Sequence, residues 1–146
     1  MRIGVAATPD VAIPTLNWLL HSEHEVALVI TQPDRPTGRG QLLQQTTIAN
    51  WAEIHQLPVV KPESARDLVG KIEDLDLVLT IGYGVLLPEN ILSLPKKGFL
   101  NLHFSLLPAY RGAALCIYYS GILHFYGHSC TAKLESEVSN TFITYL

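Results

Sequence analysis

The sequence predicts an α/β fold with an open, largely parallel sheet and helices on both faces of that sheet. Short apolar runs alternate with segments of helical periodicity from Arg2 to His103. Several of these runs are apolar at every position, which is typical of strands buried on both faces of a parallel sheet. Repeated strand–helix units of this kind indicate the doubly wound class.

Each expected element has its own signal. Residues 2–7 form an apolar strand that ends at Thr8-Pro9-Asp10, where Thr8 or Asp10 can cap a helix. Apolar residues recur at helical spacing over 11–20, which predicts that helix. The same criteria predict, in order, a strand at 26–30, a helix at 46–56, a strand at 57–60, a helix at 64–73, a strand at 76–81, a short segment opening near Pro88 and a strand at 98–103.

A turn-rich stretch at 31–40 separates the second strand from the helix at 46–56. It contains two prolines and two glycines, which forbid a regular element and predict a loop. Arg35 and Arg39 make this loop locally basic, although the formal net charge of −3 argues against a generally basic nucleic-acid binder.

Size and composition place the chain among ordinary globular domains. Its 146 residues fit one domain with a real core, and hydrophobic residues make up 48% against 16% that are charged. No apolar stretch approaches the roughly 20 residues that a membrane helix needs, so we expect no membrane association and residence in the cytoplasm. The two cysteines are expected to be reduced thiols.

A break in composition follows Ala114. All nine prolines lie at or before Pro108, no arginine follows Arg111, and both cysteines lie within 115–146. One interpretation is a variable C-terminal surface segment. The other is that 115–146 is not the sequence that originally followed Ala114, as after a frameshift. We therefore expect a domain at 1–114 and an atypical tail at 115–146 that is frameshifted in the second interpretation.

The tail holds four residues that are potential zinc ligands. They are spaced C-x7-H-x3-H-x-C, which fits no common zinc module, and we predict no metal site. The four residues are Cys116, His124, His128 and Cys130.

Ligands of an open parallel sheet bind beyond the carboxyl ends of its strands, and three segments of interest lie there. Residues 6–10 lack the G-x-G-x-x-G spacing, so binding of NAD is not predicted. Gly82-Tyr83-Gly84 lets the backbone approach a flat ligand closely, and the leucines that follow can form an apolar wall. An ordinary strand-to-helix connection is the alternative for this second segment.

The third segment carries Asn101 and His103, which are two apart on a strand and therefore point the same way. An amide donor and an imidazole that face one pocket can serve acyl or formyl transfer. Asn can donate to a developing oxyanion, whereas His can stabilise it or move protons. Two incidental polar residues at the end of a strand are the alternative for a bare Asn-x-His pair.

The match around this pair is longer than two residues. Residues 101–112 read Asn-x-His-x-Ser-Leu-Leu-Pro-x-x-Arg-Gly, which resembles the signature of the folate-dependent formyltransferases. Thr8-Pro9-Asp10 and the loop at 31–40 are similar to the methionyl-tRNA formyltransferase family in particular. The resemblance runs from Met1 to Ala114 and implies that 1–114 is the N-terminal part of a formyltransferase catalytic domain.

This resemblance implies a Rossmann-type, formyltransferase-like domain that transfers a formyl group from 10-formyltetrahydrofolate to the amino group of initiator methionyl-tRNA. It implies Asn101 and His103 as catalytic residues and Arg39, with Arg35, as contacts to tRNA phosphates. No metal is implied, and we expect a monomer. The folate-binding residues that the resemblance implies are Ser105, Leu106, Leu107, Pro108, Tyr83 and Gly84.

Beyond Ala114 the chain departs from the family. The family continues with proline where this chain has Leu115, and it then supplies a catalytic Asp in a Leu-Asp-Thr-Gly pattern that this chain lacks. We therefore expect a sheet that is incomplete at the C-terminus, no C-terminal tRNA-binding domain, and little or no activity of the chain as written. The alternatives are an inactive folate- or RNA-binding fragment and a folate-dependent formyltransferase that acts on a small amine.

Overall fold

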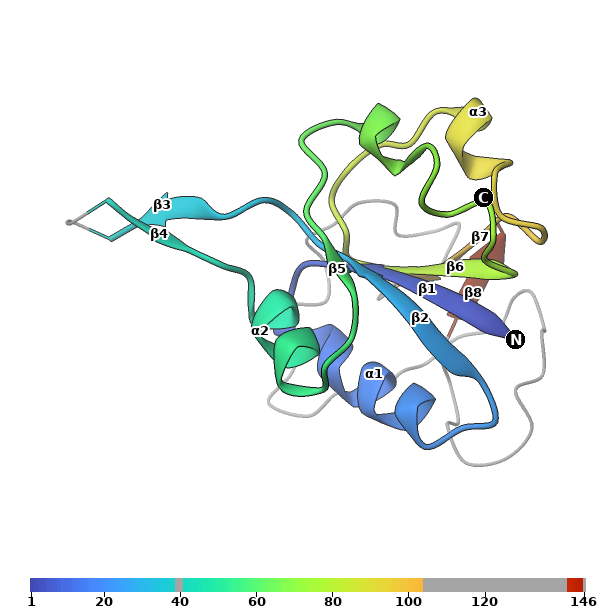
Figure 1. Cartoon of the computed structure of the whole chain (residues 1–146), viewed down its shortest axis with the longest axis horizontal. Coiled ribbons are helices and arrows are strands. Elements are labelled where there is room, and N and C mark those ends of the chain that lie inside the picture. The colour runs from blue at the N-terminus through green and yellow to red at the C-terminus, as the bar shows by residue number, and fades with distance from the viewer. Residues whose placement is uncertain (39–40, 104–141, 146) are drawn as a thin grey trace.

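The computed structural model describes residues 1–38, 41–103 and 142–145, with His103 and the last strand described as backbone. Six strands form one sheet in the order β5-β2-β1-β6-β7-β8 (Figure 1). Neighbouring strands from β5 to β7 are parallel, and β8 pairs antiparallel with β7. The strands are β1 (Arg2–Ala7), β2 (Glu25–Ile30), β5 (Val59–Val60), β6 (Leu77–Ile81), β7 (Phe99–His103) and β8 (Phe142–Tyr145).

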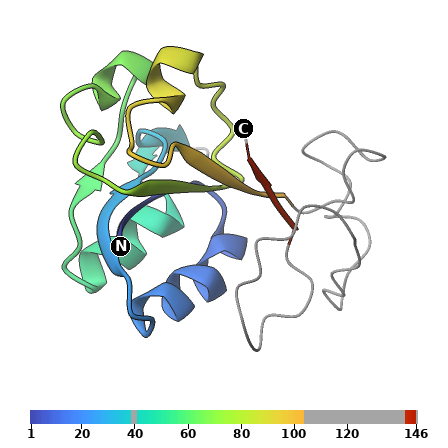
Figure 2. The same ribbon diagram turned by 90° about the vertical axis from the view of Figure 1, so that its right-hand side faces the viewer.

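Helical segments cover both faces of the sheet, as the two views show together (Figures 1 and 2). On one face lie α1 (Ile13–Leu20) and α2 (Thr47–Ile54), and on the other lie the 3₁₀ turn η2 (Ala65–Leu68) and α3 (Glu89–Leu92). The expected fold class is confirmed.

The position of β1 in the middle of the sheet explains why its sequence is apolar at almost every position. Ile3, Val5 and Ala7 pack in the core beneath α1 and α2, whereas Ala6 packs in the core beneath η2 and α3. Successive side chains of a strand point to opposite faces of the sheet, so both sets are buried when helices cover both faces. Gly4 is the small residue of the run: a Cβ there would lie 2.7 Å from Cδ1 of Leu75.

The helix expected at 64–73 is wrong. Only a single 3₁₀ turn, η2, forms in this segment, and Ser64 and Asp67 close its start as a reciprocal capping box. Gly70 then takes a φ of +79°, and its N–H donates to the carboxylate of Glu73 at 2.6 Å. A local side-chain acceptor of this kind competes with helical hydrogen bonds, and it ends the turn.

The helix expected at 11–20 forms, but its predicted cap is wrong. The segment opens with a 3₁₀ turn at Asp10–Ala12 (η1), and no side chain caps either this turn or α1. The hydroxyl of Thr8 donates instead to the main-chain carbonyl of Tyr83 at 3.0 Å. Thr8 is therefore part of a contact between loops.

The loop prediction for 31–40 is wrong at Arg35–Thr37, which forms the short strand β3. This strand pairs antiparallel with β4 (Leu42–Gln44), and the two make an arm that extends away from the sheet (Figure 1). A proline is tolerated in β3 because a two-stranded ribbon is all edge and leaves positions where no N–H is needed. In the described ranges, no helix is long and apolar enough to cross a membrane.

Candidate functional site

The strand order reverses between β1 and β6. From β1 the chain moves outward to β2 and β5, and it then returns to the other side of β1 to form β6 and β7. Ligands of open α/β sheets bind outside the carboxyl ends of the strands at such a reversal. The segments that follow β1, β2 and β6, together with the end of β7, therefore define the candidate site.

Three of these segments meet at one main-chain carbonyl. Thr8 follows β1 and Gln32 follows β2 by two positions, and both side chains donate to the carbonyl oxygen of Tyr83 at 3.0 Å. Tyr83 lies two residues beyond the end of β6. The two bonds join residues 75 and 51 positions apart in the chain, and they tie the three strand ends together at the reversal.

The loop at 82–88 combines a buried residue, Tyr83, with an exposed apolar residue, Leu86. The Tyr83 side chain is 5% exposed in the core beneath η2 and α3, and burial raises the pKa of its phenol. Gly82 and Gly84 take φ values of +56° and +76°, so the chain can reverse twice within three residues. Leu86 beyond them is 97% exposed. The loop therefore presents its backbone and Leu86 outward, while the Tyr83 ring holds it from below.

Asn101 lies on β7 with its amide held by a neighbouring strand. The alternation of β7 places Phe99 and Asn101 on the face of η2 and α3, because Phe99 packs in that core and Leu102 packs in the other. His103 occupies the next position of the same alternation and ends the strand. The hydroxyl of Thr80 on β6 donates to Oδ1 of Asn101 at 2.9 Å. This bond fixes the side of the amide that carries the oxygen, and among the described residues the amide nitrogen donates to no acceptor.

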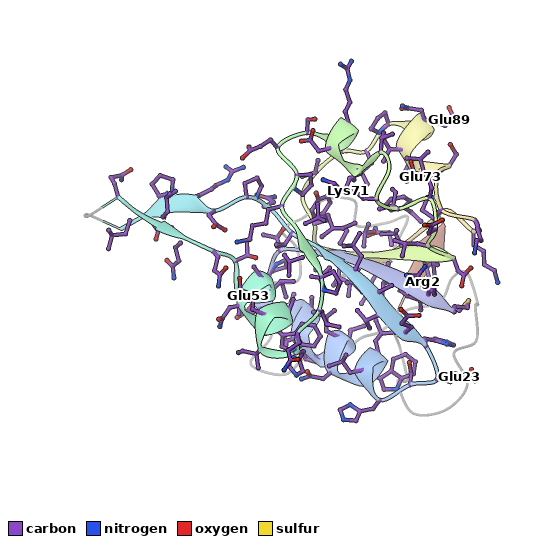
Figure 3. The ribbon with its side chains drawn as sticks, viewed as in Figure 1. Arg2, Glu23, Glu53, Lys71, Glu73 and Glu89 are labelled. Carbon is purple, nitrogen blue, oxygen red and sulfur yellow. The ribbon has the colours of Figure 1, made fainter. Side chains whose placement is uncertain are left out.

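Lys61 contacts both ends of the β3–β4 arm at its base. Nζ of Lys61 donates to Oδ1 of Asp34 at 2.7 Å and to Oε1 of Gln45 at 3.1 Å. Asp34 precedes β3 and Gln45 follows β4, so one ammonium group holds both ends of the arm. Gln45 also donates to the carboxylate of Glu53 at 3.1 Å, which ties the arm to α2. Figure 3 shows Glu53 on α2, near the base of the arm.

The arm carries both polar and apolar side chains on its exposed surface. All six residues of β3 and β4 are exposed, including Arg35. Leu42 and Leu43 are 75% and 73% exposed, which is unusual for two adjacent leucines. Such a surface offers both a guanidinium for an anion and apolar side chains for a second contact.

The structure brings only some of the predicted site residues together. Tyr83 and Gly84 follow the end of β6, Asn101 lies level with Thr80 on the neighbouring strand β7, and Arg35 lies on the arm. Outside the described residues lie Arg39, Ser105, Leu106, Leu107, Pro108 and the four potential zinc ligands of the tail. Among the residues that are described, no group of three or more His, Cys, Asp or Glu could hold a metal ion.

Three residues near the site carry contacts that were not predicted. They are Thr8, Gln32 and Thr80. Their position in the sequence could have drawn attention to them, because each residue lies close to the carboxyl end of a predicted strand. Their side-chain types alone are too common in loops and strands to identify a site.

Comparisons with known proteins agree on the first four-fifths of the chain. A family model described as "Formyl transferase" matches residues 1–117. A methionyl-tRNA formyltransferase of Alkaliphilus oremlandii is 46% identical over 117 residues, which cover 77% of this chain and 38% of the relative. One of Idiomarina loihiensis is 48% identical over 118 residues, 78% of this chain and 37% of the relative. The chain thus spans less than two fifths of the length of these relatives.

Proposed function

The chain belongs to the formyl transferase family, and on that premise we propose that it carries the formyl-transfer region of a methionyl-tRNA formyltransferase. The reaction moves a formyl group from 10-formyltetrahydrofolate to the amino group of initiator methionyl-tRNA, a step of translation initiation in the cytoplasm. The family predicted from the sequence is confirmed by these relatives. The observation that carries the proposal further is the oriented amide of Asn101 beside the reversal of strand order.

The chemistry requires one bond to form and one to break. The amine of methionyl-tRNA attacks the formyl carbon, and the carbonyl oxygen becomes an oxyanion. When the intermediate collapses, the bond to N10 of tetrahydrofolate breaks, N10 takes a proton and the former amine has lost one. The protein therefore has to stabilise negative charge on one oxygen and to move a proton between two nitrogens.

Asn101 and His103 are proposed for these two tasks. In this proposal the amide nitrogen of Asn101 donates to the oxyanion, and the imidazole of His103 moves the proton. A positioned oxyanion donor contributes on the order of 2.7–4 kcal/mol to the barrier, and a positioned acid or base contributes roughly 10²- to 10⁴-fold in rate. The Thr80 hydroxyl supports the first task, because it holds the amide oxygen away from the reacting group.

The folate donor is proposed to lie along the loop at 82–88. The backbone around Tyr83 and Gly84 can approach a flat ring closely, and Leu86 supplies apolar surface. The family resemblance adds Ser105, Leu106, Leu107 and Pro108 as the opposite wall.

The tRNA is proposed to contact the arm. Arg35 and Arg39 pair with phosphate oxygens through their guanidinium groups, which match phosphate geometry in a bidentate manner. The anchor at Lys61 supports this role, because it holds both ends of the arm in one place.

A chimera tests the proposal directly. Residues 1–114 would be joined to the remaining sequence of the Alkaliphilus oremlandii relative, and transfer of a labelled formyl group from 10-formyltetrahydrofolate to methionyl-tRNA would be measured. Turnover by the chimera that is lost in Asn101→Ala supports the proposal. Formylation of a small amine without use of methionyl-tRNA would favour a different formyltransferase, and no turnover with either acceptor would refute the proposed activity.

A further inference from the structure

The carbonyl oxygen of Tyr83 is the point at which the segments after β1, β2 and β6 meet. It accepts from Oγ1 of Thr8 and from Nε2 of Gln32, each at 3.0 Å. A main-chain carbonyl oxygen has two lone pairs, so these two side chains satisfy it fully. Both donors come from strand ends that are remote in sequence, and neither belongs to the loop itself.

We propose that Thr8 and Gln32 are positioning residues that hold the loop at 82–88 as a wall of the folate pocket. This inference rests on the proposed function for the identity of the ligand. The two residues touch neither the folate nor the reacting atoms in this proposal. They act through the Tyr83 carbonyl, and through it on the exposed part of the loop.

The loop needs such support because little else holds its middle. Among the described residues, no hydrogen bond between main-chain groups is made by 83–87. The Tyr83 ring anchors one end, and Leu87 packs against the same core at the other. Between them Leu86 is 97% exposed and gains nothing from packing. A pocket wall must be held within about 0.5 Å of its binding geometry, and bonds to the backbone are the means by which a bare loop achieves this.

Gly84 fits this interpretation. A Cβ at this position would lie 3.1 Å from Nε2 of Gln32, which is too close for an unstrained contact. The φ of +76° also disfavours any other residue there. The glycine for which the family resemblance implies a folate contact is therefore also the glycine that admits the Gln32 amide to the Tyr83 carbonyl.

Thr8 is available for this task because it caps no helix. The N-cap position of the following turn is Pro9, and no side chain makes a capping bond there. The hydroxyl of Thr8 is partly buried, and its bond bridges β1 and β6, the two strands between which the order reverses.

The test compares loop order with folate binding in the full 146-residue chain. Thr8→Val and Gln32→Leu each remove one donor at nearly constant size, and Thr8→Ser keeps the hydroxyl. Order parameters of the backbone amides at 83–87 are measured first by NMR relaxation without ligand. The dissociation constant for 5-formyltetrahydrofolate, a stable relative of the donor, is then measured by calorimetry.

We expect lower order parameters at 83–87 and about two- to tenfold weaker binding for Thr8→Val and Gln32→Leu, since one hydrogen bond to a partly buried carbonyl is lost. Thr8→Ser should match the parent chain in both readouts. The control is Ser22→Ala, which removes a hydroxyl donor to the carbonyl of Leu19 at 2.7 Å, in the turn after α1. It should leave both readouts unchanged.

The outcomes separate the positioning role from the folate role. Unchanged order parameters in Thr8→Val and Gln32→Leu would overturn the positioning role. Lower order parameters with unaltered folate affinity would overturn the role of the loop as a folate wall. The same effects in Ser22→Ala would mean general loosening of the chain and would overturn the positioning role. If the parent chain binds no folate, the proposed ligand is wrong, and the order parameters alone still decide whether Thr8 and Gln32 position the loop.

Discussion

The hydroxyl of Thr80 donates to Oδ1 of Asn101 at 2.9 Å across the paired strands β6 and β7. The two residues are direct partners in the register of the sheet, so strand pairing itself brings the hydroxyl to the amide. Thr80 is buried and Asn101 is partly buried. The amide is therefore oriented before any ligand arrives, which is the condition under which a donor to a developing oxyanion needs no reorganisation.

This relationship predicts graded effects on catalysis in the chimera that carries 1–114. Asn101→Ala should lower kcat by about 10²- to 10³-fold, because the proposed oxyanion donor is lost. Thr80→Val should lower kcat by only about two- to tenfold, because the donor remains but its orientation relaxes. Thr80→Ser keeps the hydroxyl and should restore most of the rate. Steady-state kinetics decide this, and a Thr80→Val variant changed in KM alone would contradict it.

The sheet could be predicted from the sequence because strands that are buried on both faces are continuous runs of apolar residues. Strands β1, β2 and β6 are apolar almost throughout, and helices cover both sides of them. The segment at 64–73 misled the prediction because its spacing of apolar residues is helical. Leu68 and Ile72 are indeed both buried. The positive φ of Gly70 and the Glu73 carboxylate decided against a helix, and neither effect is visible in periodicity.

The site could be predicted only in part. Asn101 is marked by a specific motif and a strand end, whereas Thr8 and Gln32 matter through a carbonyl that lies 75 and 51 positions away in the chain. Such contacts depend on the order of strands in the sheet, which the sequence pattern does not specify. The arm was missed as a strand pair because its prolines and glycines predict irregular chain, and two short edge strands tolerate them.

The Lys61 anchor predicts a selective effect on tRNA use. Lys61→Met removes the ammonium that holds Asp34 and Gln45, so the arm loses its fixed direction. In the chimera we expect KM for methionyl-tRNA to rise by about three- to tenfold and KM for 10-formyltetrahydrofolate to stay constant, since one or two charge-assisted bonds are lost. Lys96→Met is the matched control, because it breaks a pair of 3.0 Å with Asp76 elsewhere on the surface. Equal effects of the two variants on tRNA use would refute the anchor.

The end of α2 predicts a stabilising substitution. Gln56 takes a φ of +56° directly after the C-cap residue His55. The N–H of Gln56 donates to the carbonyl of Glu53, and that of Leu57 donates to the carbonyl of Ala52, which together form a Schellman motif. Gln56→Gly should raise the free energy of unfolding by about 0.5–1 kcal/mol, because glycine adopts this conformation without a steric penalty. Urea unfolding measures the change, and a decrease would contradict the prediction.

Asp76 predicts a loss of stability in acid. The N–H of Arg2 donates to its carboxylate at 2.8 Å, and this bond, followed by that of Lys96, lowers the pKa of Asp76. A depressed pKa in the folded state means that the contribution is present above the unfolded value of about 4 and is lost as the pH falls through the folded pKa. Asp76→Asn should therefore lower the Tm at pH 7. The difference from the parent chain should shrink steadily below about pH 4, and a constant difference down to pH 2 would argue against this role.

The chain as written is expected to transfer formyl groups far more slowly than the chimera. In the family that it resembles, a carboxylate orients the catalytic imidazole, and the Leu-Asp-Thr-Gly pattern that carries it is not found in this chain. The strand that pairs with β7 offers no substitute, because β8 runs antiparallel and its residues are Phe-Ile-Thr-Tyr. Loss of an orienting Asp lowers the rate on the order of 10⁴-fold in comparable His-dependent sites.

Assays of the 146-residue chain and of the chimera under the same conditions measure the ratio of their formyl-transfer rates. Turnover of the chain within about tenfold of the chimera would mean that 115–146 completes the site by a carboxylate of its own, and Glu135→Gln and Glu137→Gln would then identify which one.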